Sequence, residues 1–193
     1  YFQAKVVGDS VQGQVVWGYT QALAGLFIAL GAPILGALAD AYGPRKPGLI
    51  ICSLAGIPAM LALWYVAPGQ VWLGVAAIVI AAVTMEFAAV YHNAMLPSVA
   101  TEKNVGFISG IGYSFDYVGS VALFMLWLAI PSLGLLSMLD GEYAHERLSG
   151  PLAAIWLVVF SLPFLFFTAD RAPSQVSILK AARSAVKNRK GSE

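Results

Sequence analysis

Two carboxylates lie inside long apolar stretches of this chain. Glu86 falls in a run that extends from residue 71 to 96, and Asp116 falls in another from 106 to 134. A carboxylate at the centre of a lipid bilayer costs roughly 2.5–3.5 kcal/mol on insertion scales, so it is expected to face the bundle interior, be protonated or have a partner. Contact with a transported solute or ion is one role for such groups. A structural hydrogen bond to a neighbouring helix is the other.

Asn93 belongs with these carboxylates because of its spacing. It follows Glu86 by seven residues, so the two share one face of a helix. We therefore take Glu86, Asn93 and Asp116 as candidate contacts for a substrate or ion. For the neighbouring His92, which lies toward the end of its run, an interfacial or structural role is favoured over proton transfer.

Patterns typical of enzymes are weak. Two histidines and one cysteine do not make a zinc-type cluster. The segment GDSVQG lacks the spacing of a nucleophile elbow, and SGIGYS lacks the lysine of a phosphate-binding loop. We therefore expect no enzymatic activity, no cofactor, no metal site and no nucleic-acid partner.

The elements that position these residues are predicted to be membrane helices. The chain is 59% hydrophobic and only 11% charged, and its mean hydropathy is +0.77. Its apolar runs approach the roughly 20 residues that a spanning helix needs, and they are too long and too uniform for the alternating strands of a membrane barrel. The fold class is therefore all-α membrane protein. Five spans are expected, at 15–39, 49–67, 71–96, 106–134 and 151–169.

The basic residues predict how the spans are oriented. One side holds nine lysines and arginines, and the other side holds only Lys5 and Arg147. Because basic loops stay in the cytoplasm, we expect the loops at 40–48 and 97–105 and the C-terminal tail to be cytoplasmic. The N-terminus would then lie outside, and one further leading helix would complete six spans with both ends inside.

Small residues form a stripe along the first span. They recur at steps of three and four, so all share one helix face, and such faces let helices approach closely in lipid. We interpret this stripe as a packing face; its members are Gly18, Ala22, Gly25, Ala29, Ala32 and Gly36.

A short charged segment separates the first two spans. Glycine and proline supply a tight turn there, but turn chemistry leaves Asp40 unexplained, because an anion is disfavoured at the C-terminal end of a helix. The spacing G-x-x-x-D-x-x-G-x-R-K resembles the signature loop between the second and third helices of major facilitator transporters. The residues that carry it are Gly36, Asp40, Gly43, Arg45 and Lys46. The resemblance implies that this loop takes part in gating.

Longer segments narrow the resemblance. VVWGYTQALAGLFIALGAPILGALADAYGPRKP, YHNAMLP and ISGIGYSFDYVGS resemble the bacterial branch of the vacuole-effluxer-like transporters, which includes the fungal autophagy-related vacuolar amino-acid exporters. Members have twelve helices in two halves, so the five spans would be helices 2–6. Residues 1–169 would form a partial N-terminal bundle, and 170–193 would begin the central cytoplasmic loop. The resembling pattern usually has glycine at Asp116, so the family assigns that residue no role.

The function implied by this resemblance is secondary active transport by alternating access. The substrates would be small polar metabolites, amino acids first. The expected partners are membrane lipid, the missing C-terminal half and a small-molecule substrate, and the expected location is a bacterial inner membrane. Two alternatives stay open. One is a small self-assembling membrane protein that forms a dimeric pore or transporter, and the other is a non-transporting membrane scaffold.

Overall fold

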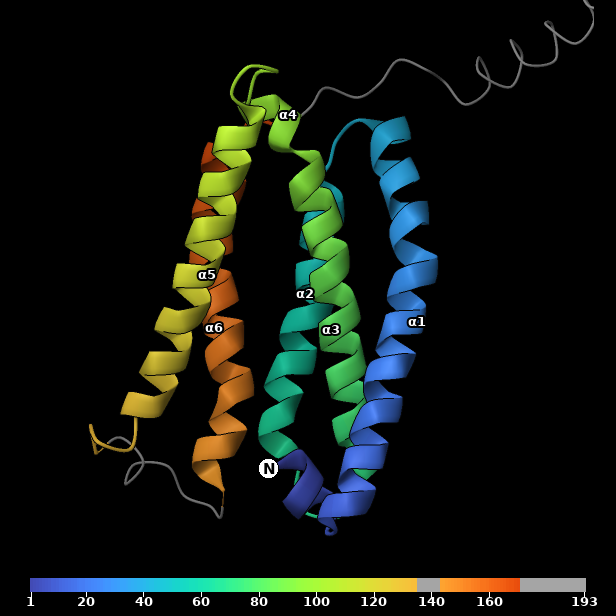
Figure 1. The fold of residues 1–193 in the computed structure, drawn as a ribbon, viewed down its shortest axis with the longest axis vertical. Coiled ribbons are helices and arrows are strands. Elements are labelled where there is room, and N and C mark those ends of the chain that lie inside the picture. The colour runs from blue at the N-terminus through green and yellow to red at the C-terminus, as the bar shows by residue number, and fades with distance from the viewer. Residues whose placement is uncertain (135–142, 171–193) are drawn as a thin grey trace, which may run out of the picture.

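The computed structural model describes residues 1–134 and 143–170. Five long helices run side by side through this part of the chain (Figure 1), and no strand occurs in it. The long helices are α1 (Ser10–Tyr42), α2 (Lys46–Ala62), α3 (Val71–Ala94), α5 (Val105–Ala129) and α6 (Ala144–Phe167). The short elements are η1 (Phe2–Val6), η2 (Leu63–Tyr65) and α4 (Leu96–Val99).

All five long helices are long and apolar enough to cross a membrane, which confirms the predicted fold class. Their ends differ from the expected spans. α1 has 33 residues, or about 50 Å at 1.5 Å per residue, so it extends beyond a hydrocarbon core of about 30 Å. α5 ends at Ala129 rather than near residue 134, close to Pro131, which has no N–H to continue the helix. α6 begins at Ala144, before the expected start at 151.

Local capping sets both ends of α1. The Asp9 side chain accepts hydrogen bonds from the backbone N–H groups of Val11 and Gln12, both at 2.8 Å, and so satisfies two donors that a helix N-terminus leaves free. Gly43 follows the helix with a φ of 90°, a conformation that favours glycine, and its N–H bonds to the carbonyl oxygen of Ala39 at 3.3 Å.

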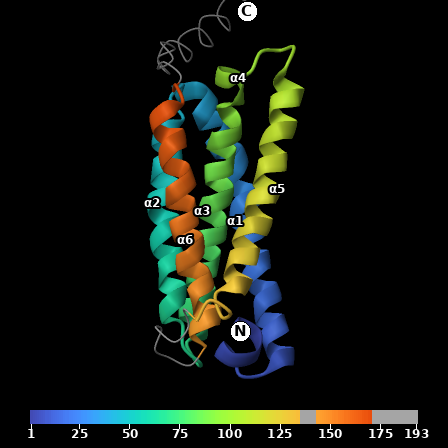
Figure 2. The same cartoon turned by 90° about the vertical axis from the view of Figure 1, so that its left-hand side faces the viewer.

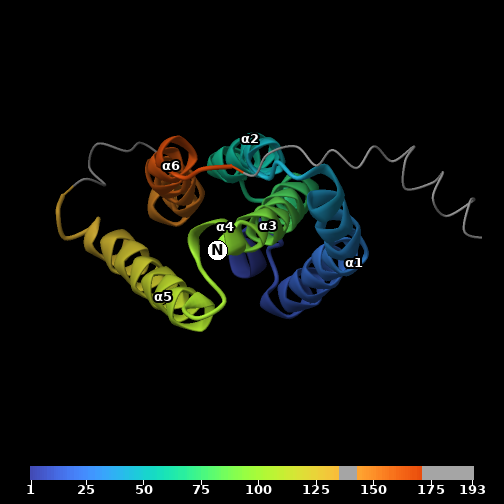
Figure 3. The same ribbon diagram turned by 90° about the horizontal axis from the view of Figure 1, so that it is seen from above.

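α3 occupies the middle of the bundle. It packs against α1 on one side and α2 on the other, and α2 also packs against α6 (Figure 3). A small apolar core forms where α2, α3 and α6 meet, around buried Leu49, Cys52 and Ala88. α5 stands apart from this group and makes only limited contacts, with α6 and α4 (Figure 2).

Two of the glycines at close helix contacts show how little room the backbone leaves there. A Cβ atom on buried Gly150 would collide with the carbonyl oxygen of Met60, so α6 can lie against the end of α2 only because residue 150 has no side chain. Likewise, a Cβ on Gly31 of α1 would meet the ring of Phe87 in α3.

The small-residue stripe on α1 does not form these contacts. A Cβ atom on Gly18, Gly25 or Gly36 would have no heavy atom within 4 Å in the described residues. α1 instead packs on α3 beside Gly31, with Thr20 and Ala24 buried. The predicted packing face is thus unoccupied in the described part of the chain.

We call the two ends of the bundle the Arg45 end and the Tyr1 end. The Arg45 end contains the turn between α1 and α2, the short helix α4 and the last turn of α6 (Figure 1). At the Tyr1 end, the Tyr1 hydroxyl donates to the carbonyl oxygen of Val66 at 2.8 Å and accepts from Nε of Arg147 at 2.9 Å. These bonds join the first residues to the turn before α3 and to the start of α6.

Candidate functional site

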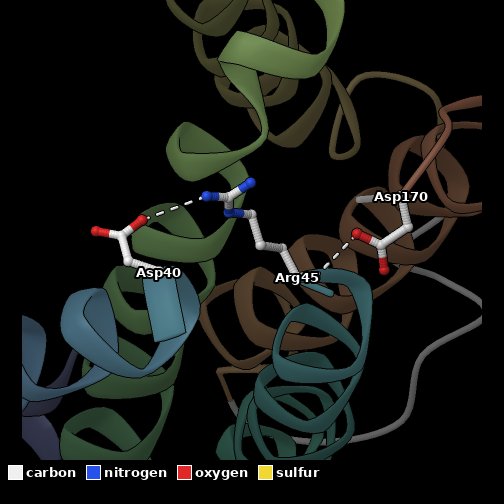
Figure 4. Close-up of polar contacts among 3 residues, drawn as sticks. All are labelled: Asp40, Arg45 and Asp170. Atoms are coloured by element: carbon white, nitrogen blue, oxygen red, sulfur yellow. Dashed lines mark hydrogen bonds and ion pairs between the residues drawn. The ribbon is translucent and has the colours of Figure 1, made fainter. Parts of the chain in front are cut away.

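Three residues, Gly43 to Arg45, form the whole connection between α1 and α2. Across this turn, Nη2 of Arg45 lies 3.3 Å from Oδ1 of Asp40, as Figure 4 shows. The pair answers the question left by the sequence. Asp40 lies near the negative end of the α1 dipole, and the Arg45 guanidinium provides the positive charge that this position requires.

The two partners differ greatly in exposure. The Arg45 side chain is 4% exposed and that of Asp40 is 78% exposed. An ion pair between two exposed side chains contributes only about 0–1 kcal/mol to stability, but a buried guanidinium depends more strongly on its partner. Furthermore, Nε of Arg45 is buried and has no hydrogen-bond partner among the described residues. Asp40 is therefore the one described side chain that pairs with the Arg45 guanidinium, and separating the two leaves a buried charge without a partner.

A second carboxylate, Asp170, holds the other side of the turn. Its Oδ1 accepts from the backbone N–H of Arg45 at 2.9 Å, and its Oδ2 accepts from that of Lys46 at 3.1 Å (Figure 4). These N–H groups belong to the first turn of α2, where backbone donors lack partners within the helix and negative charge is favourable. Asp170 thus caps α2 from beyond the end of α6.

Lys46 binds α6 in return. Its Nζ donates to the carbonyl oxygen of Leu165 at 2.6 Å, in the last turn of α6, where a cation is favourable. The start of α2 and the end of α6 are therefore joined by three hydrogen bonds. From this joint the Arg45 guanidinium extends to Asp40 on α1.

Sequence reasoning identified most of this turn. The structure brings together Asp40, Gly43, Arg45 and Lys46, whereas Gly36 lies one turn before Asp40 on the open face of α1. Asp170 was missed, because 124 residues separate it from Lys46. The sequence shows an acidic residue, Asp170, directly after an apolar span, but this pattern does not indicate which residues Asp170 binds.

A cavity of about 340 Å3 opens between α3, α5 and α6, and it includes residues of α4 at the Arg45 end. Two of the predicted contact residues, Asn93 and Asp116, line it. Asn93 is the next-to-last residue of α3, and Asp116 lies eleven residues after the start of α5, about 16 Å from that end. The cavity therefore extends from the Arg45 end to the middle of α5.

Most of the other polar lining residues come from the same three long helices, and Thr168 directly follows α6. Ser109 and Tyr113 precede Asp116 on one face of α5, at helical spacing. His92 lies on α3 with its ring centroid 4.8 Å from that of Phe164 on α6, and both residues line the cavity. The sequence favours an interfacial or structural role for His92, and it does not indicate the place of His92 beside Asn93 in the cavity wall.

Glu86 is not part of the cavity wall. It lies seven residues before Asn93 on α3, and its side chain is exposed. In residues 1–134 and 143–170 it makes no hydrogen bond and no ion pair, so the partner expected for a carboxylate at this depth is not found in the described chain. The structure thus brings Asn93 and Asp116 together and leaves Glu86 outside.

In residues 1–134 and 143–170, no group of three or more His, Cys, Asp or Glu side chains converges.

Comparison with known proteins gives the family. Residues 3–107, more than half of the chain, match the family described as vacuole effluxer Atg22 like. The chain belongs to this family. The match to the Atg22-like family covers α1 to α4, and hence the Asp40–Arg45 turn, Glu86 and Asn93. It ends before Asp116 and Asp170.

A relative of this Atg22-like chain is the protein named "Uncharacterized MFS-type transporter YxiO" from Bacillus subtilis (strain 168). The two are 27% identical over 159 residues, which is 81% of this chain and 37% of the relative. The chain therefore spans little more than a third of the length of the curated relative that it matches. No solved structure matches it.

Proposed function

We propose that this Atg22-like chain is part of a secondary active transporter that moves small polar metabolites by alternating access. The observation that carries the proposal is the turn between α1 and α2. It joins two candidate spans, it contains the Asp40–Arg45 ion pair, and it lies within the region that matches the effluxer family.

In this proposal, α1, α2, α3, α5 and α6 are helices 2–6 of a twelve-helix fold, and residues 1–169 form most of the first bundle. Three observations support a second bundle. The small-residue face of α1 is unoccupied, α5 stands apart, and the chain covers 37% of its transporter relative. Residues 170–193 would then lead to that bundle; beyond Asp170 this segment lies outside the described residues.

The Arg45 end is the cytoplasmic end in this proposal, since it carries most of the basic loop residues. The membrane is a bacterial plasma membrane, and lipid covers the outer helix faces. The Asp40–Arg45 pair closes the cytoplasmic side in one state and separates when the bundles rock.

The solute site lies between the bundles near the middle of the membrane. Asn93 and Asp116 contact the solute from the cavity wall. Glu86 lies about 12 Å from the end of α3, at a depth similar to that of Asp116, and its exposed side chain is available to a solute or ion held against the second bundle. The family favours amino acids as the first substrate class to test.

Flux measurements test the proposal. The full-length transporter in vesicles is given a panel of labelled amino acids and other polar metabolites, beside Glu86→Gln, Asp116→Asn and the control Glu102→Gln. Glu102 is an exposed carboxylate in the link before α5, outside the cavity wall. We expect flux in the parent and in the control, and loss of most flux in Glu86→Gln or Asp116→Asn, or in both, at equal abundance. Absence of flux for every solute would contradict the proposed function.

A further inference from the structure

Trp127 and His145 join the last turn of α5 to the first turn of α6. Nε1 of Trp127 donates to the carbonyl oxygen of His145 at 3.1 Å. In return, Nε2 of His145 lies 2.9 Å from the carbonyl oxygen of Trp127, and it donates, because a carbonyl only accepts. The two rings stack, with centroids 4.2 Å apart and planes 11° apart. Two hydrogen bonds and a stack therefore connect the same two residues.

Pro131 explains why the Trp127 carbonyl is available. In a continuing helix that carbonyl would accept from the backbone N–H of residue 131, and proline has no N–H. The ring of His145 supplies the missing donor. Because a carbonyl without a partner is costly among apolar groups, this bond satisfies the end of α5 and at the same time holds it against α6.

α5 is anchored at this end and diverges from α6 at the other. Ile130, directly after the helix, is 4% exposed, and Trp127 is half-buried. α5 lies beside α6 near the Tyr1 end and is farther from it at the Arg45 end (Figure 2), as the view from above also shows (Figure 3). The α5 residues that line the cavity all belong to the diverging half, from Ile108 to Asp116. The cavity therefore opens where the two helices separate.

The diverging half of α5 has room for a closer approach. Gly112 lines the cavity, and a Cβ atom on it would meet no heavy atom within 4 Å in the described residues. The same is true of Gly106 and Gly110. Glycines on a membrane helix let another helix come close. A movement of this half toward the other cavity walls would therefore meet little side-chain bulk from α5 at these positions.

From this geometry we propose that the Trp127–His145 contact is a fixed pivot, about which α5 swings to widen and narrow the cavity at the Arg45 end. The exposed link at 101–104 gives that end of α5 the freedom to move. The swing is a motion within one bundle, and so goes beyond the proposed function, in which two bundles rock against each other. His145 is then a positioning residue for α5, since it lies outside the cavity wall.

Distances between spin labels in the purified full-length transporter test the pivot. Native cysteines are replaced, and pulsed electron paramagnetic resonance is recorded for two pairs of labels. One pair, at Gly106 of α5 and Ile51 of α2, reports on the Arg45 end; the other, at Met125 of α5 and Trp72 of α3, reports on the Tyr1 end. All four positions are exposed in the described chain. We expect two resolved distance populations for the first pair and a single narrow population for the second.

Variants then assign the narrow population to the pivot. His145→Phe keeps an aromatic ring on Trp127 and removes the Nε2 donor, so the Tyr1-end distribution should broaden, whereas Glu102→Gln should leave it unchanged. Adding Pro131→Ala to His145→Phe restores a backbone N–H for the Trp127 carbonyl. Because that N–H belongs to α5 itself, we expect the unfolding temperature to recover toward that of the parent and the distribution to stay broad.

A single population at the Arg45 end would overturn the inference, as would equally broad distributions at the two ends. A parent-like Tyr1-end distribution in folded His145→Phe, or a narrow one in the double variant, would reduce His145 to a partner for one carbonyl. If the variants are unfolded, the two distributions of the parent decide. The proposed function fails separately: flux with a rigid α5 would remove the pivot alone, and a swinging α5 without flux of any solute would remove the transporter alone.

Discussion

At the scale of single residues, the turn between α1 and α2 depends on a carboxylate from the far end of the described chain. Asp170 uses both oxygens, one on the N–H of Arg45 and one on the N–H of Lys46. Hydrogen bonds to a charged group contribute about 1.5–3 kcal/mol each, and Asp170 makes two of them, whereas Asp40 makes a single contact of 3.3 Å with Arg45. Asp170, rather than Asp40, therefore fixes where the turn lies.

Replacing Asp170 by Asn tests this ranking. The amide keeps one acceptor oxygen and loses the charge, so we expect destabilisation by about 1–3 kcal/mol and a lower unfolding temperature. Cys52 provides the readout, since it is the single cysteine of this chain and is buried between α2 and its neighbours. Its thiol should react with a maleimide at lower temperature in Asp170→Asn. The control, Glu102→Gln, should behave like the parent; equal curves for all three proteins would contradict the assignment.

At this scale, the sequence predicts contacts between charged residues that lie close together along the chain. Asp40, Arg45 and Lys46 lie within seven positions, so a motif can describe them. Asp170 acts through the fold, and its role depends on α6 ending beside the start of α2. Glu86 is another residue whose contacts the sequence does not predict. Its position deep in an apolar run is visible in the sequence, but the partner expected at that depth is not among the described residues.

At the scale of elements, α6 is positioned by one close approach. Gly150 brings the α6 backbone against the carbonyl oxygen of Met60 and the side chain of Leu63, and a backbone atom cannot move aside as the end of a side chain can. The contact lies near the Tyr1 end of α6. The opposite end of the same helix is joined to α2 by Asp170 and Lys46.

We expect Gly150→Ala to destabilise the protein by about 1–3 kcal/mol, the usual cost of overpacking. Gly119→Ala on α5 is the matched control, since a Cβ there meets nothing within 4 Å in the described chain. The helical preference of alanine should leave the control unchanged or raise its stability by up to about 1 kcal/mol. Thermal unfolding in detergent measures both. A Gly150→Ala variant as stable as the parent would show that α6 does not depend on this contact.

The helices themselves were predictable because each is a long apolar run. Their ends were less so: the sequence placed the start of α1 at 15, and the Asp9 cap extends it to Ser10. Nor did the apolar runs indicate which helices would pack together. The small-residue stripe of α1 pointed to a packing face, whereas the contact with α3 is made beside Gly31.

At the scale of the whole molecule, two surfaces lack neighbours in the described chain. The small-residue face of α1 is open, and large side chains on α5 such as Phe107, Phe115 and Phe124 are more than half exposed. Lipid accepts exposed apolar side chains. By contrast, a regular row of glycine and alanine is typical of a helix face that makes close contact with another helix.

If the open face of α1 meets the second bundle, added bulk there should block transport. We expect Gly25→Leu to abolish most flux in the full-length transporter at unchanged abundance, because a leucine would hold the helices apart. Phe27→Leu, at an exposed position two residues away on another face of α1, is the control and should transport normally. Vesicle flux and membrane abundance are measured together. Normal flux in Gly25→Leu would mean that this face meets lipid.

The pair of hydrogen bonds from Asp170 also gives the molecule a mechanical connection. The polypeptide after residue 170 is attached directly to Asp170, the residue that is hydrogen-bonded to the start of α2. Tension along that polypeptide is therefore delivered first to two hydrogen bonds at the α1–α2 turn, and only afterwards to the backbone bonds of α6. The Asp40–Arg45 contact is made by the side chain of the same Arg45, so it directly adjoins the first of these two bonds.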